Sequence, residues 1–229
     1  MSAAKAAAST VTQDYLKVIW TAREWDAEEP VTTTMLAARM GVSASTASEA
    51  IKRLADQGLV RHAPYRSIEL TETGRRLALA MVRRHRLLET FLVVKMGYGW
   101  DEAHDDAEIL EHAASNQFID RVDEILGHPA ADPHGDPIPS GDGTVARPAA
   151  VPLSTVPAPC RAQVVRISDA DPAMLRYFAT VGLVPEAQVT VVERRDYAGV
   201  IGLRVAGSDD VVSLGGVAAE AVWVAPEQA

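Results

Sequence analysis

One short run of this chain holds the residue types that bind metal ions in proteins. On a helix of 3.6 residues per turn, positions 104, 108, 111 and 112 fall on one face. That face carries two imidazoles and two carboxylates, from His104, Glu108, Glu111 and His112. Nitrogen and oxygen donors on one stripe predict half of a site for a divalent metal. The alternative is a solvated acidic face, but Ile109 and Leu110 indicate that this helix also has a side facing a core.

Further candidate ligands lie on other predicted helices. His85 and Glu89 are four residues apart, within a helix predicted from Thr73 to Lys95. Taken alone, such a pair is usually a surface pair. Asp14 would likewise be a solvated residue of its own helix. His134 is expected in a loop or at the surface, from which it can approach the site.

The elements upstream of these residues read as a DNA-binding unit. A helix over Thr33–Met40, a tight turn at Gly41-Val42-Ser43 and a helix over Ser45–Gln57 form a helix-turn-helix, with Ser43 as the N-cap. Strands Leu59–Arg61 and Ser67–Thr71, joined by a turn around Pro64-Tyr65-Arg66, predict a β-wing. Small polar residues at the start of the second helix suit the major groove, and cationic side chains reach phosphates. The predicted DNA contacts are Ser43, Ser45, Thr46, Ser48, Glu49, Lys52 and Arg66. A purely protein-binding tri-helical unit is the alternative.

Downstream, helical periodicity predicts two shorter helices, at His104–Ser115 and Gln117–Leu126. A Pro/Gly-rich stretch runs from Gly127 to Pro159, and the Val-rich segments after it predict short strands with one helix over Asp171–Val181. We therefore predict an α+β multidomain chain that ends in a small β-barrel. The domains are a winged helix-turn-helix (1–75), a helical metal-binding and dimerisation domain (76–143), a Pro-rich linker (144–159) and a barrel domain (160–229).

Charge and composition narrow the class of protein. The net charge of −9 argues against a generic nucleic-acid binder, and residues 97–143 carry twelve acidic residues against one base, Arg121. A bound cation would offset part of this acidity. The single cysteine, Cys160, fits a reducing cytoplasm. Met1–Thr10 lacks a signal-peptide pattern, and no apolar run is long enough to span a membrane. No catalytic motif stands out, so no enzyme is expected.

Taken together, these motifs resemble the diphtheria toxin repressor family. The resemblance rests on Thr12-Gln13-Asp14-Tyr15-Leu16, the helix-turn-helix, Arg84-His85-Arg86-Leu87-Leu88-Glu89, the 104–112 stripe and Pro133-His134-Gly135-Asp136-Pro137-Ile138-Pro139. It implies a homodimer that binds operator DNA when loaded with metal and represses metal-uptake genes. It also implies that the C-terminal domain is SH3-like.

Within that family, the chain resembles the manganese branch. The iron branch has Met and Cys where this chain has Asp14 and Glu108, and hard oxygen donors suit Mn²⁺. The resemblance implies a primary site of Asp14, Glu108, Glu111 and His112, and a second site of His85, Glu89, His104 and Asp171. Two residues depart from the pattern: Lys17 stands where some manganese sensors have a carboxylate, and Met174 stands near a polar ligand of the iron branch.

Three alternatives stay open at this point. The first is an Fe²⁺-responsive repressor of the same family. The second is a winged-helix regulator that senses an organic ligand. The third is a metal hydrolase built on the His/Glu cluster, which leaves the winged helix unexplained.

Overall fold

The computed structural model describes residues 9–26, 29–63 and 66–227. The chain divides into two compact units, one made of residues 1–85 with 139–144 and the other of residues 86–138 with 145–229. The predictions for Met1–Thr10 and for the turn at Pro64-Tyr65-Arg66 lie partly outside the described residues. No described helix is both long and apolar enough to cross a membrane.

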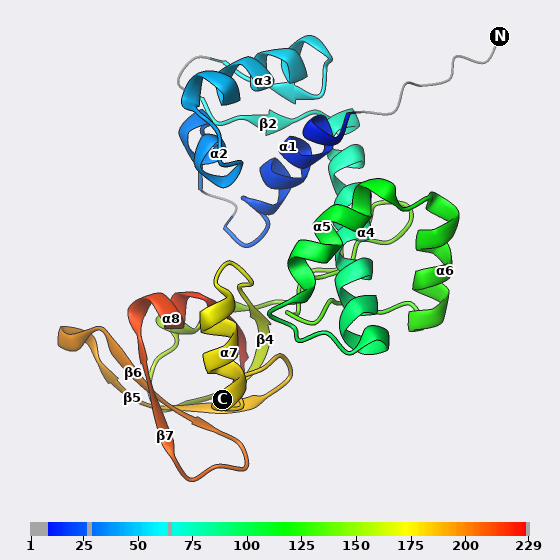
Figure 1. Ribbon diagram of the computed structural model, residues 1–229. Helices are drawn as coiled ribbons and strands as arrows, with labels where there is room; N and C mark the ends of the chain where they lie inside the picture. The colour runs from blue at the N-terminus through cyan, green and yellow to red at the C-terminus, as the bar shows by residue number, and fades with distance from the viewer. Residues whose placement is uncertain (1–8, 27–28, 64–65, 228–229) are drawn as a thin grey trace. The chain divides into compact units, whose positions relative to one another are not determined.

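Three short helices form the body of the first unit. They are α1 (Thr10–Thr21), α2 (Thr33–Arg39) and α3 (Ala44–Asp56) (Figure 1). The buried positions of α3 are Ala47, Ala50, Ile51 and Leu54, which is the spacing of a single helical face. Gly41 turns the chain between α2 and α3 at a positive φ of 63°, a conformation that glycine adopts without strain.

An antiparallel ribbon follows α3, as the sequence pattern predicts. Strand β1 (Val60–Arg61) pairs with β2 (Glu69–Leu70). The long helix α4 (Glu72–Met96) begins directly afterwards, and the Thr71 hydroxyl accepts a hydrogen bond of 3.1 Å from the amide of Gly74. The helix-turn-helix and the ribbon therefore share one core with the start of α4, through residues such as Leu36, Ile68 and Ala78.

The second unit begins with the rest of α4, which packs with α5 (Ala103–Ala113) and α6 (Asn116–Leu126). Its core includes Leu88, Ala107 and Val122. Our prediction that Ile109 and Leu110 mark the core side of α5 is wrong, because these side chains are 70% and 40% exposed. The small residues Ala103 and Ala107 are buried instead, and they allow α5 to lie close to its neighbours.

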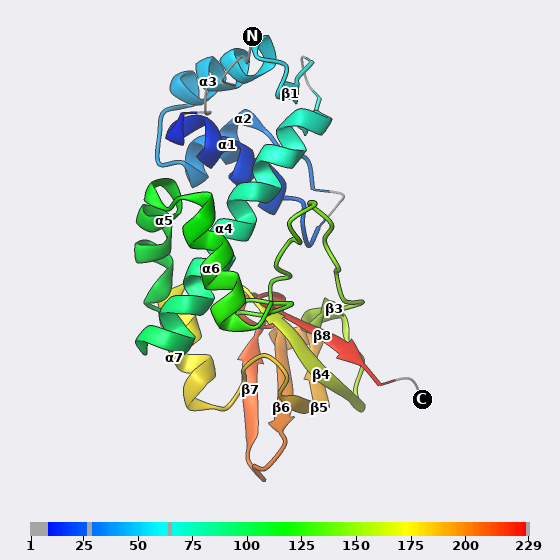
Figure 2. The ribbon, with the colours of Figure 1, turned by 90° about the vertical axis from the view of Figure 1, so that its right-hand side faces the viewer.

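A six-stranded antiparallel sheet completes the second unit (Figure 2). Its strands are β3 (Val151–Pro152), β4 (Cys160–Ile167), β5 (Gln188–Arg195), β6 (Val200–Val205), β7 (Val211–Gly215) and β8 (Val222–Pro226). They lie in the order β3-β8-β4-β5-β6-β7, so β3 and β7 are the edges among the described strands. Helix α7 (Pro172–Thr180) packs into the core of the sheet through Leu175 and Phe178. Three further elements are short: η1 (Leu153–Thr155), η2 (Asp196–Ala198) and α8 (Gly216–Glu220).

Polar contacts connect the helices and the sheet of this unit. The amide of Ile167 on β4 donates a hydrogen bond of 2.8 Å to the carbonyl of His134. Arg166 donates to Asp136 at 2.8 Å, and Arg176 donates to Asp101 at 3.0 Å. Within 144–159, the stretch that the sequence predicts as linker, β3 pairs with β8, and Leu153 is fully buried in the core of the sheet.

Candidate metal centre

Helix α5 presents the first group of candidate ligands. Its buried line is Ala103, Ala107 and Glu111, and the Glu111 side chain is only 1% exposed. Glu108 and His112 lie beside this line, and each of the three ligand residues offers one donor atom within 4.8 Å of the others. Nε2 of His112 lies 3.7 Å from Oε1 of Glu111. Part of the stripe predicted from helical spacing therefore converges on one point.

A second group joins three elements of the second unit. Glu89 on α4 is 1% exposed, and its Oε1 lies 3.2 Å from Nδ1 of His104 on α5. The same nitrogen lies 3.7 Å from Oδ2 of Asp169, in the loop before α7. Nε2 of His104 lies 3.8 Å from Oε1 of Glu108. His85 is buried on α4, one turn before Glu89.

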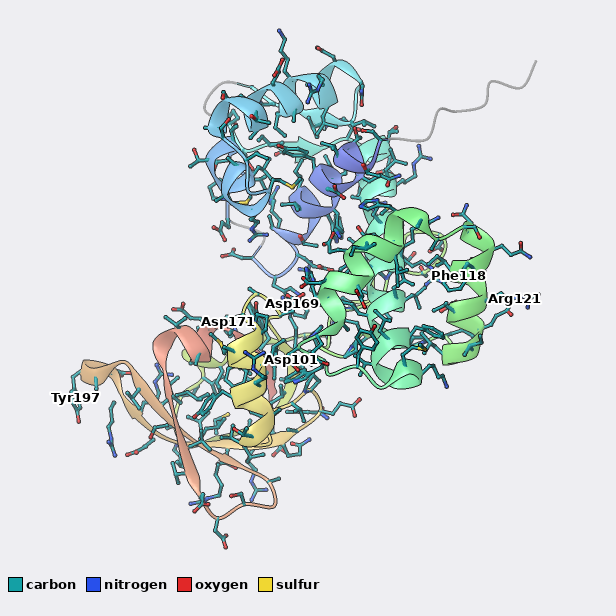
Figure 3. The ribbon with its side chains drawn as sticks, in the orientation of Figure 1. Asp101, Phe118, Arg121, Asp169, Asp171 and Tyr197 are labelled. Atoms are coloured by element: carbon teal, nitrogen blue, oxygen red, sulfur yellow. The ribbon has the colours of Figure 1, made fainter. Side chains whose placement is uncertain are left out.

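In the structure, Asp171 lies at the start of α7. Its Oδ1 accepts hydrogen bonds from the amides of Ala173 at 2.8 Å and Met174 at 3.3 Å, so Asp171 is the N-cap of α7. Asp169, two residues earlier, is the residue whose carboxylate approaches His104. Figure 3 labels both aspartates at the start of α7. The Asp-Pro pair at 171–172 is a common start of a helix, and this signal could have identified the cap.

We expected His134 in a loop or at the surface. It does lie in a loop, but it is 1% exposed. Oδ1 of Asp132 accepts hydrogen bonds from the amides of His134 at 2.9 Å and Asp136 at 3.0 Å, which fixes a tight turn. Gly135 completes this turn at a φ of +90°, with the backbone of Val165 directly against its α-carbon. The motif is therefore a folded loop seated on β4.

Negative charge dominates the surroundings of this loop. Burial, and then the charges of Asp136 and Glu89, raise the pKa of Asp132 to about 8. Burial lowers the pKa of His134, but the charges of Asp132, Glu89 and Asp169 outweigh it, so that this pKa lies above its usual value. In both groups the neighbouring carboxylates favour the protonated form, and for Asp132 burial has the larger effect. Arg86 supplies positive charge here, with Nε 3.6 Å from Asp132 and a hydrogen bond of 2.7 Å to the carbonyl of Pro137.

The donor atoms of both groups fit a divalent transition metal. They are carboxylate oxygens and imidazole nitrogens, and neither group includes a thiol or a thioether. Such donors suit Mn²⁺, Fe²⁺ and Zn²⁺, whereas sulfur donors favour softer ions. Asp14 belongs to the first unit, where it is half-buried on α1, and Lys17 is buried one turn later on the same helix.

The residues predicted to contact DNA are all exposed in the first unit. At the start of α3, the Ser43 hydroxyl accepts from the amide of Thr46 at 3.2 Å, which confirms Ser43 as the N-cap. The same hydroxyl lies 2.9 Å from the Ser45 hydroxyl and 2.8 Å from the Thr46 hydroxyl. Small hydroxyl side chains thus cover the N-terminal end of the second helix of the helix-turn-helix.

Comparisons with known proteins agree with this arrangement. Residues 8–68 match the model of the iron-dependent repressor N-terminal DNA-binding domain, residues 71–140 that of the iron-dependent repressor metal-binding and dimerisation domain, and residues 151–226 that of the FeoA domain. The iron-dependent repressor IdeR of Mycobacterium tuberculosis is 33% identical over 195 residues, which cover 79% of this chain and 83% of IdeR. The diphtheria toxin repressor of Corynebacterium diphtheriae is 36% identical over 133 residues, 57% of each chain.

Solved structures of metal-dependent regulators are also similar to this chain over most of its length. A manganese-dependent transcriptional repressor in complex with manganese has a TM-score of 0.89 at 56% identity, with 93% of this chain and 98% of that one covered. The manganese regulator SloR has a TM-score of 0.79 at 29% identity, with 94% and 98% covered. A DNA-binding domain, a helical metal-binding and dimerisation domain and a C-terminal β-sheet domain define a class of metal-dependent transcriptional repressors. The chain belongs to the diphtheria toxin repressor family.

Proposed function

We propose that this chain is a Mn²⁺-sensing repressor that binds operator DNA as a homodimer and controls metal-uptake genes. The observation that carries the proposal is the buried carboxylate of Glu111, which converges with Glu108 and His112 in a group that contains no sulfur donor. A manganese-dependent repressor that is 56% identical supports the choice of metal.

The proposed primary site consists of Glu108, Glu111 and His112 with Asp14. The proposed second site consists of His85, Glu89, His104 and Asp171, and Asp169 offers a further carboxylate close to His104. A bound ion would supply positive charge that offsets the negative charge of these carboxylates. The carboxylates of Glu108 and Glu111 repel one another without it, and Asp14 would be the ligand that α1 contributes. The two DNA-binding domains of the dimer would then be held at the spacing that the operator requires.

The finer predictions from the sequence belong to the same proposal. We propose a cytoplasmic protein without enzymatic activity, with domains at 1–75, 76–143 and 160–229 and a connecting segment at 144–159. We also propose that the sheet is an SH3-like barrel, which the match to the FeoA domain and the packing of α7 support.

Operator binding titrated with separate metals tests the function. The DNA probe is a fragment selected from a random pool by the Mn²⁺-loaded protein, and fluorescence anisotropy reports binding. Mn²⁺ should activate binding by the wild type but not by Glu111→Ala. Asp105→Ala, an exposed substitution on the same helix, is the control. Activation only by Fe²⁺ under anaerobic conditions would select the iron-responsive alternative, and normal Mn²⁺ activation of Glu111→Ala would refute the primary site.

A further inference from the structure

Glu49 is the longest exposed side chain on the first two turns of α3, the second helix of the helix-turn-helix. The other exposed residues of these turns are an alanine, two serines and a threonine, at positions 44, 45, 48 and 46. Glu49 follows Ser45 by four residues, so the two share one exposed stripe of the helix with Ser48. The core side of α3 is formed by other positions, among them Ala47 and Ile51. A carboxylate therefore projects from the centre of the surface that the proposed function assigns to DNA.

The carboxylate of Glu49 forms no hydrogen bond or ion pair with another residue in the described part of the chain. Lys52 and Arg53 follow it by three and four residues, the spacings at which ion pairs form along a helix, yet neither pairs with it. By contrast, the hydroxyls of Ser45 and Thr46 both lie within hydrogen-bond distance of the Ser43 hydroxyl, at 2.9 and 2.8 Å. Glu49 thus keeps its full capacity to accept hydrogen bonds from a partner outside the chain.

An acidic side chain on a DNA-binding surface is repelled by the phosphates unless a base compensates for it. A carboxylate accepts hydrogen bonds but donates none. In the major groove, guanine and thymine offer it only acceptor oxygens and nitrogens, and adenine places its acceptor N7 beside its N6 amino group. Cytosine offers the N4 amino group, which is a donor. Cytosine is therefore the base that gives a carboxylate an attractive contact without a repulsive one.

We propose that Glu49 recognises a cytosine of the operator by accepting a hydrogen bond from its N4 amino group. At a rise of 1.5 Å per residue, Glu49 lies about 7.5 Å along the axis from Ala44, in the N-terminal part of the helix that reaches base edges in helix-turn-helix proteins. The small side chains of Ser45 and Ser48 allow the helix to approach the floor of the groove. Lys52, which is nearer the end of the helix, is suited to a phosphate.

This inference rests on the proposed function, because it assigns a base to one residue of the proposed operator-binding surface. Glu49→Gln tests it most directly. Glutamine has nearly the same size as glutamate, but its amide forms two hydrogen bonds with N6 and N7 of adenine. The matched control is Asp56→Asn, which removes an exposed carboxylate seven residues later on the same side of α3, about 10.5 Å further along the axis.

The probe is a duplex selected from a random pool by the Mn²⁺-loaded wild type. Each of its base pairs is replaced in turn by the other three, and fluorescence anisotropy gives the affinity of each protein for every duplex. We expect the wild type to prefer cytosine at one base pair of each half-site by at least ~5-fold. Glu49→Gln should prefer adenine at that base pair and keep the wild-type preferences elsewhere. Asp56→Asn should keep the preference for cytosine.

The inference would be overturned, with the proposed function left intact, if Glu49→Gln kept the wild-type preference at every base pair. A uniform gain in affinity of Glu49→Gln for all duplexes would also overturn it, because Glu49 would then only repel phosphates. Complete loss of selective binding in this variant, or a wild type without a cytosine-specific base pair, would overturn it as well. A wild-type chain that selects no duplex in the presence of Mn²⁺ would instead refute the proposed function.

Discussion

Replacing Glu111 by Gln should remove about half of the stabilisation that Mn²⁺ gives this protein through the proposed primary site. A ligand oxygen of Glu111 lies within 4.8 Å of one of Glu108. Two negative charges at that distance repel by ~0.9 kcal/mol in water and by ~3.5 kcal/mol at an effective dielectric constant of 20. The Glu108 side chain is 38% exposed, so the lower half of this range, about 1–2 kcal/mol, applies. Glu111→Gln removes both this repulsion and a ligand, so the metal-free state has less to gain from an ion.

The assay is thermal unfolding with and without Mn²⁺. At a concentration 100 times the dissociation constant, an ion stabilises the folded state by about 2.7 kcal/mol, and a tenfold weaker site gives only about 1.4 kcal/mol. The shift in Tm caused by Mn²⁺ should therefore be about 3–5 °C smaller in Glu111→Gln than in the wild type. Asp105→Asn is the control for loss of a carboxylate from α5. A full Mn²⁺-dependent shift in Glu111→Gln would refute the assignment of Glu111 as a ligand.

Three other changes probe separate features. Asp14→Met combined with Glu108→Cys should move activation of operator binding from Mn²⁺ towards Fe²⁺, since softer donors replace oxygens; an unchanged ratio of the two metal midpoints would show that these positions do not set selectivity. Gly135→Ala should lower the free energy of unfolding by more than ~2 kcal/mol in urea, because φ is +90° and the added carbon would collide with the carbonyl of Val165; a loss below ~1 kcal/mol would mean that the loop relaxes. Ser43→Ala should cost about 1 kcal/mol through loss of the cap on α3, whereas Ser43→Asn should stay near the wild type; equal stability of the two variants would contradict the capping role.

Elements with a strong periodic pattern could be predicted from the sequence. The apolar spacing of α3 and its cap at Ser43 are local features, so they required no knowledge of the rest of the fold. The Val-rich strands were predictable for the same reason. By contrast, β3 lies within a Pro-rich stretch, and it becomes a strand only because β8 offers a partner, with Val151 opposite Val224. The short helix α8 begins with Gly216, which lowers any helical signal there.

The candidate metal site likewise has features that the sequence predicts and features that depend on tertiary packing. The convergence of Glu108, Glu111 and His112 follows from spacing along a single helix. The approach of Asp169 to His104 and the burial of His134 depend on how distant segments pack, and no local pattern records this. The exposure of Ile109 was also unpredictable from its type, because α5 buries alanines on the face that packs in the core.

The packing of the 132–136 loop on β4 has a consequence for local unfolding of this part of the protein. Ile167 donates its amide hydrogen to the carbonyl of His134, and Arg166 holds Asp136. The end of β4 cannot separate from the loop without breaking the hydrogen bond between Ile167 and His134, so the Ile167 amide should exchange with solvent only when the loop itself lifts. Amide exchange at the end of β4 would thus report the opening of a loop that lies outside the sheet.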